Sequence, residues 1–94
     1  MLIDNLIGTE ALLGQAAEEA MELGKALLKL QRILHGTNPT PVSREQAEQD
    51  IMEESADLAN CLTELDRAGI CTVDEATRRR KMKRWHEGLE AHNA

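Results

Sequence analysis

The stretch TEALLGQAAEEAMELGKALLKLQRILH, residues 9–35, decides the fold. It is rich in leucine and alanine at helical spacing and poor in β-branched residues, so it predicts one long α-helix. Thr9 is a plausible N-cap, and Gly36 is well placed to end the helix after His35. Such a helix is about 39 Å long, whereas a compact domain of this size has a radius of gyration of only about 12 Å.

The length of this helix predicts an oligomer, because one copy of the remaining chain can hardly cover its apolar side. That side includes Leu12, Leu13, Leu23, Leu27, Leu30 and Leu34. We therefore expect an all-α fold, a helical bundle with three main helices per chain. Oligomerisation to a homodimer or tetramer would complete it, with a four-helix-bundle-like core. The alternative is a monomeric three-helix bundle with a frayed first helix.

The rest of the chain predicts two further helices. The connector GTNPTPV at 36–42 contains two prolines, which forbid regular helix. Ser43 and Gln46 form a capping box for a second helix that runs to about Ala68 and stops at Gly69. Thr72 and Glu75 form a second capping box, which begins a third helix that continues to roughly Leu89. Residues 1–94 thus make a single domain, in which 1–8 are a lead-in with a short extra turn and 90–94 a frayed tail.

Composition limits the classes of function. The 94 residues include no Phe or Tyr and a single Trp, and the scarcity of aromatic and β-branched residues favours helix over sheet. The net charge of −6 argues against stable nucleic-acid binding. Cys61 and Cys71 are too few for a disulfide framework or a zinc site. With no basic leader and no apolar run approaching about 18 residues, we expect a cytoplasmic protein without a membrane span.

One arrangement of acids occurs twice, as EEAMEL at residues 18–23 and EESADL at residues 53–58. On a helical wheel each copy lies at the edge of the apolar stripe of its own helix. If the two helices pack side by side, the side chains that converge are Glu19, Glu22, Glu54 and Asp57.

Converging carboxylates predict a metal site, because like charges at close range disfavour simultaneous ionisation unless a cation lies among them. Hard carboxylate oxygens suit Mg²⁺, with Mn²⁺ as a second possibility, and i,i+3 spacing lets two side chains of one helix reach the same ion. The alternative is an ordinary solvated surface, on which Lys25 and Lys29 pair with Glu22 and Glu18.

EEAMEL followed by EESADL resembles the paired ExxE and ExxD helices of the MazG-like, all-α nucleoside triphosphate pyrophosphohydrolases, over roughly residues 12–85. The chain looks like the short single-domain members common in phages and prophages. The resemblance implies four metal ligands: Glu19, Glu22, Glu54 and Asp57. It also implies catalytic roles for Glu18 and Glu53, the first acid of each motif, which would bind a second ion or orient water. The long connector with its prolines departs from the family pattern.

The implied reaction is Mg²⁺-dependent hydrolysis of a nucleoside or deoxynucleoside triphosphate to the monophosphate and pyrophosphate. Attack by water is expected, because no Ser-His-Asp or Cys-His arrangement is evident. Two rival functions remain: a non-catalytic helical interaction module, and a phosphoribosyl-ATP pyrophosphohydrolase with the same metal chemistry.

Further candidates for substrate binding lie beside the acids and near the C-terminus. The segment RRRKMKRW at 78–85 predicts a phosphate-facing patch, with Lys81 and Arg84 one turn apart, or else a solvated helix face whose cations suit the helix dipole. Trp85 is a candidate for stacking on a base or for anchoring the core. Lys25 and Asn60 are candidates for substrate contact, although Asn60 is equally a polar group at an interface.

Overall fold

The computed structural model describes residues 3–36, 42–71 and 74–93, and within these ranges the chain forms helices and no β-strand. The helices are α1 (Ile3–Ile7), α2 (Thr9–His35), α3 (Arg44–Arg67) and α4 (Glu75–Asn93). The three long helices expected from the sequence are therefore present, and the extra turn before Thr9 is the short helix α1. In the same ranges, no helix is both long enough and apolar enough to cross a membrane.

Glycines delimit α2 at both ends. Gly8 occupies the N-cap position at φ 88°, and Gly36 occupies the C-cap position at φ 75°, where its N–H donates to the carbonyl oxygen of Arg32 at 2.9 Å. Both φ values lie in the region that only glycine adopts without strain. The prediction that Thr9 caps this helix is wrong: Thr9 lies inside α2, and its hydroxyl donates to a carboxylate oxygen of Asp4. The cause is α1, which ends immediately before Gly8 and presents Asp4 to that hydroxyl.

The start of α3 is confirmed, because the Ser43 Oγ accepts a hydrogen bond from the backbone N–H of Gln46 at 3.1 Å. The helix ends at Arg67, and Gly69 follows at φ 77°. The N–H of Ile70 then donates to the carbonyl oxygen of Leu65 at 3.0 Å, which satisfies one of the terminal carbonyls.

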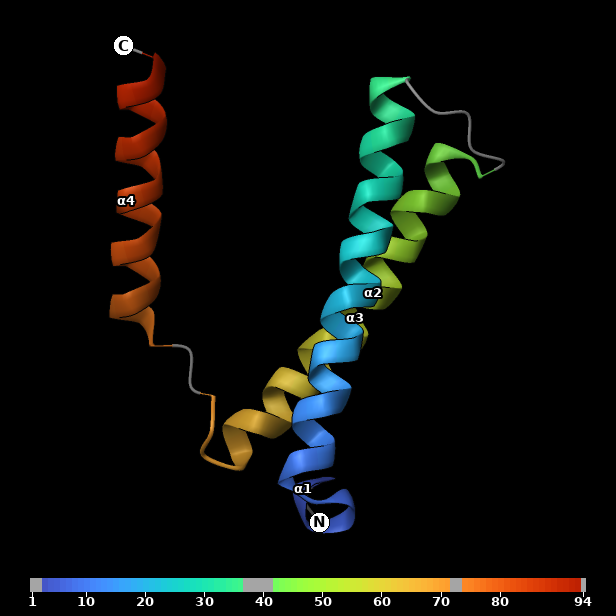
Figure 1. Ribbon diagram of the computed structural model, residues 1–94, viewed down its shortest axis with the longest axis vertical. Helices are drawn as coiled ribbons and strands as arrows, with labels where there is room; N and C mark the ends of the chain where they lie inside the picture. The colour runs from blue at the N-terminus through green and yellow to red at the C-terminus, as the bar shows by residue number, and fades with distance from the viewer. Residues whose placement is uncertain (1–2, 37–41, 72–73, 94) are drawn as a thin grey trace.

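Helices α2 and α3 run antiparallel beside one another and form a hairpin, with α1 in contact with both (Figure 1). A buried cluster joins the two long helices: Leu12 and Ala16 from α2, and Cys61 and Leu65 from α3. Ala26 and Ala47 are buried as well. Most of these side chains are small, so the two helices can approach closely. Cys61 packs here as a small apolar residue.

Helix α4 stands apart from the α2–α3 hairpin, as Figure 1 shows, and none of its residues is buried. No contact between α4 and the other helices occurs among the residues that the structure describes. Its first turn is capped by Asp74, whose carboxylate accepts from the N–H of Thr77 at 3.2 Å and from its hydroxyl at 2.8 Å. Thr72, the predicted cap, lies outside the described residues. The helix continues past Leu89 to Asn93, so residues 90–93 of the predicted frayed tail are helical.

A single chain leaves much apolar surface uncovered, and its radius of gyration of 17.0 Å exceeds the value of about 12 Å for a compact chain of this length. Three leucines predicted to face the core, Leu13, Leu27 and Leu34, are 45%, 49% and 57% exposed. Trp85, for which a core position was one prediction, is 63% exposed. Met21, Met52 and Met82 are also exposed. These positions do not belong to the core of one chain, because only the narrow seam between α2 and α3 is covered.

The Ser43 cap provides a test of the fold. We expect Ser43→Ala to lower the free energy of unfolding by about 1 kcal/mol, because the N–H of Gln46 loses its acceptor. Ser55→Ala is the matched control: Ser55 is an exposed residue inside α3, so the change should stay within about 0.5 kcal/mol. Urea unfolding followed by circular dichroism measures both, and equal losses in the two variants would contradict the role of the cap.

Candidate metal centre

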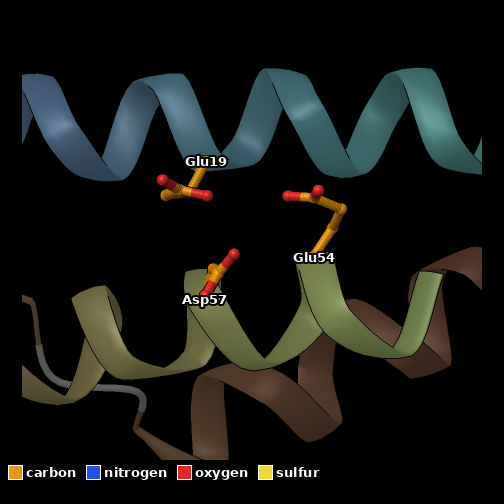
Figure 2. Close-up of side chains that lie close together, drawn as sticks. All are labelled: Glu19, Glu54 and Asp57. Carbon is orange, nitrogen blue, oxygen red and sulfur yellow. The ribbon is translucent and has the colours of Figure 1, made fainter. Parts of the chain in front are cut away.

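Three carboxylates from two helices meet in the α2–α3 hairpin. Glu19 of α2 points toward Glu54 and Asp57 of α3, as Figure 2 shows, and one oxygen from each lies within 4.8 Å of the other two. Glu19 and Glu54 are half-buried and Asp57 is exposed. We call these three residues the acid cluster.

The positions of two of these acids follow from the way the helices pack. Glu19 lies one turn from the buried Ala16, and Glu54 lies in the same helical row as Leu58 and Cys61. Both acids therefore lie at the seam between the helices, where they are half-buried. Gln15 fixes Glu19 further, since its side-chain amide donates to a carboxylate oxygen of Glu19 at 2.7 Å.

The electrostatics of the cluster are unfavourable for the ionised acids. The pKa of the Glu54 carboxyl is raised above its ordinary value of 4.5, first by partial loss of hydration and then by the charges of Asp57, Glu19, Glu22 and Asp50. The pKa of the neighbouring Cys61 thiol is raised as well, first by burial and then by Glu19 and Asp57. Among the described residues of one chain, no cationic side chain forms an ion pair with the three acids.

Glu22 does not join the three carboxylates, contrary to the prediction of four converging acids. Its carboxylate is bonded to the ammonium group of Lys25 at 3.3 Å, which is the pairing expected for a solvated surface. It still influences Glu54 through its charge. The reason is angular: Glu19 faces the seam between the helices, whereas Glu22 lies about 60° farther around α2.

Glu18 and Glu53, predicted to be catalytic, also lie outside the acid cluster. Both are exposed, and the Glu53 carboxylate accepts a hydrogen bond from the side-chain amide of Gln49 at 3.3 Å on its own helix. Asn60 is exposed on α3. Glu18 and Glu53 are thus not among the carboxylates that meet there.

A pocket of about 180 Å³ adjoins the cluster and shares Glu54 with it. Its lining is Glu22, Lys25, Ala26, Lys29, Asp50 and Glu54. Lys25, predicted to bind substrate, is thus close to the acids. Asp50, Lys29 and Gln15 were not predicted from the sequence as members of this site. Helical spacing could have indicated two of them, because Asp50 precedes Glu54 by one turn and Gln15 precedes Glu19 by one turn.

Lys81, Arg84 and Trp85 line an open hollow on one side of α4. Because α4 makes no described contact with the hairpin, the expectation that Lys81 and Arg84 lie beside the acids is not met within one chain.

No protein-family model, curated protein or solved structure matches this chain.

The raised pKa of Glu54 predicts a pH-dependent stability. The folded protein holds this proton to higher pH than the unfolded chain, so ionisation of Glu54 destabilises the metal-free fold as the pH rises above 4.5 and through the raised pKa. We expect Glu54→Gln to raise the melting temperature at about pH 7.5 in EDTA, and to change it little at about pH 4, where Glu54 is protonated.

Glu53→Gln is the control, since it removes one charge from the same helix outside the cluster. A Glu54→Gln variant whose melting temperature matches that of the Glu53→Gln variant at both pH values would show that the cluster is not strained by its charge.

Proposed function

We propose that this chain is a Mg²⁺-dependent nucleoside triphosphate pyrophosphohydrolase of the MazG-like type, which releases pyrophosphate and a nucleoside monophosphate. The observation that supports it best is the meeting of Glu19, Glu54 and Asp57 from two helices. Two of these acids come from the EESADL motif and one from EEAMEL, so the convergence agrees with three of the four metal ligands that the resemblance implies.

The acid cluster fits a hard divalent cation. Its donors are all carboxylate oxygens, which suit Mg²⁺ or Mn²⁺ better than a soft metal. Loss of hydration and then the neighbouring charges raise the pKa of Glu54, and a cation among the three side chains would offset the repulsion between those charges. Glu19, Glu54 and Asp57 would hold the ion, and Glu22 would be a fourth candidate after release from Lys25.

The remaining groups of the site have distinct roles in this proposal. Gln15 orients the Glu19 carboxylate, and Lys29, on the wall of the adjoining pocket, attracts the phosphate groups of the substrate. When bound, the cation supplies positive charge that neutralises phosphate oxygens and acidifies a water molecule. Solvent at the exposed Asp57 edge of the site would take up the proton that the attacking water loses.

We also propose that the working form is a homodimer or tetramer in the cytoplasm. Leu13, Leu27 and Leu34 recur on α2 at multiples of seven residues, and all three are exposed. Helical spacing and antiparallel packing place Leu62 of α3 on the same side of the hairpin. This leucine face, made of these four residues, lies away from the acids, so two hairpins can pack through it while their acid sides stay open. Both cysteines are free thiols, which is compatible with a reducing compartment.

The exposed leucine face also favours a second function, a non-catalytic module that binds another helical protein. A phosphoribosyl-ATP pyrophosphohydrolase remains the enzymatic alternative, since it uses the same metal chemistry. Incubation with a panel of canonical and modified nucleotides and phosphoribosyl-ATP, with Mg²⁺, separates the three. Pyrophosphate release from none of them would favour the module.

The enzymatic proposal predicts that the acid cluster is required for pyrophosphate release. We expect Glu19→Gln and Asp57→Asn each to lower kcat/KM by about a hundredfold or more while leaving the helix content unchanged. Glu48→Gln is the control, because Glu48 pairs with Arg44 on the surface of α3 outside the cluster. Mg²⁺ should raise the melting temperature of the wild type and the control but not of the two cluster variants. Full activity in either cluster variant at saturating Mg²⁺ would overturn the assignment.

The oligomer predicts a specific effect of charge on the leucine face. We expect Leu27→Lys to weaken self-association by about tenfold or more in analytical ultracentrifugation, because it buries an unpaired ammonium group. Met21→Lys is the matched control: Met21 is 60% exposed but lies on the side of α2 that faces away from α3. A wild type that sediments as a monomer at every concentration would refute the proposal.

A further inference from the structure

Helix α4 has the composition of a docking element without a docking site on its own chain. Met82, Trp85 and Leu89 recur at i, i+3 and i+7, which places them along one stripe. They are 49%, 63% and 48% exposed. An apolar stripe of this kind on a helix that contacts nothing in its own chain indicates a partner surface.

Three cations beside this stripe are available to a partner. Arg78 and Arg79 pair with Glu75, and Lys83 pairs with Glu87, all within α4. In contrast, Arg80, Lys81 and Arg84 form no ion pair with any residue that the structure describes. These three lie within an arc of about 100° that adjoins the apolar stripe next to Trp85.

The charge of α4 is complementary to that of the hairpin. Helix α4 contains six Lys and Arg against three Glu, a net charge of +3, whereas α3 contains eight Asp and Glu against two Arg, a net charge of −6. The three carboxylates of the acid cluster form no ion pair among the described residues, and two cations of α2, Lys25 and Lys29, line the pocket beside them. Complementary patches of this kind guide association and fix its orientation.

We propose that α4 of one chain docks on the acid side of the α2–α3 hairpin of a second copy, and brings Lys81 and Arg84 next to the acid cluster there. A second copy is the partner that supplies the complementary charge without any further protein. The acid side also stays accessible in the oligomer proposed above, because the leucine face lies on the other side of the hairpin. The catalytic consequence rests on the proposed function: with a triphosphate present, Lys81 and Arg84 contact phosphate oxygens while the acids of the other chain hold the cation.

Trp85 reports docking directly, because it is the single tryptophan of the chain. We expect its emission to shift to shorter wavelength as the protein concentration rises in EDTA, since docking covers the exposed indole. In Lys81→Ala/Arg84→Ala the midpoint of this shift should move to about tenfold higher concentration, because two favourable charge contacts are lost.

The matched control is Arg79→Ala/Lys83→Ala, which removes the same charge from cations that are already paired on the other side of α4. It should keep the midpoint of the wild type. Equal midpoints for both double variants, or no shift in the wild type at concentrations where it sediments as an oligomer, would overturn the docking. A shift produced only by an added oligonucleotide or by anionic vesicles would assign α4 to that other partner.

Mixing two inactive variants tests whether α4 acts on the other chain. Glu54→Gln/Asp57→Asn has a defective acid cluster and an intact α4, and Lys81→Ala/Arg84→Ala has the reverse. If α4 acts between chains, the co-expressed pair has one complete site in each mixed dimer, so random pairing restores about a quarter of wild-type pyrophosphate release. If α4 serves its own chain, no site is complete and the mixture stays inactive.

The two proposals fail separately. An inactive mixture beside an active wild type overturns the sharing of α4 and leaves the enzyme in place. An inactive wild type overturns the enzymatic function and with it the catalytic role of α4, while the Trp85 emission still decides whether α4 docks on a second copy.

Discussion

The contact between α2 and α3 is the constraint on which the rest of the structure depends. Its buried residues are mostly small, with Ala16, Ala26, Ala47 and Cys61 beside two leucines, so the helices lie close together. Glu19 and Glu54 are half-buried in the same seam, and with Asp57 their carboxylates lie close together. Apolar burial thus brings negative charges together, and the pKa of Glu54 is raised first by loss of hydration and then by these neighbouring charges.

The features that the sequence predicted correctly are those set by residues close together in the chain. Ser43 with Gln46, and Gly36 after His35, are local signals, and the structure confirms both helix ends. Thr9 was assigned wrongly because its hydroxyl bonds to Asp4 in another helix. The site shows the same dependence on local and distant residues. Glu19, Glu54 and Asp57 were predicted to converge from their spacing along each helix. The exclusion of Glu22 depends on how α2 is rotated against α3, and spacing along one helix does not determine that rotation.

The core was the least predictable part, for a physical reason. Hydrophobic periodicity marks every apolar side of a helix, and it cannot distinguish a side that faces the same chain from one that faces another. Here the seam within the chain passes through alanines, and the leucines Leu13, Leu27 and Leu34 lie beside it in solvent. The expected apolar side is thus divided: Leu12 is buried against α3, whereas Leu13, Leu27 and Leu34 are left uncovered by their own chain.

The distribution of charge explains how an acidic chain could handle an anionic substrate. A net charge of −6 opposes the approach of a triphosphate, but that charge is not spread evenly: α3 alone accounts for as much, and α4 carries the opposite sign. Lys25 and Lys29 line the pocket that Glu54 shares, but neither forms an ion pair with the acid cluster, so its oxygens stay available to a cation. In the proposed docking, the cations of α4 come from another chain, so they can leave the acids for phosphate oxygens once a metal ion and a triphosphate bind. The segregation of charge into α3 and α4 therefore supports the proposed site, which would bind a cation and an anion together.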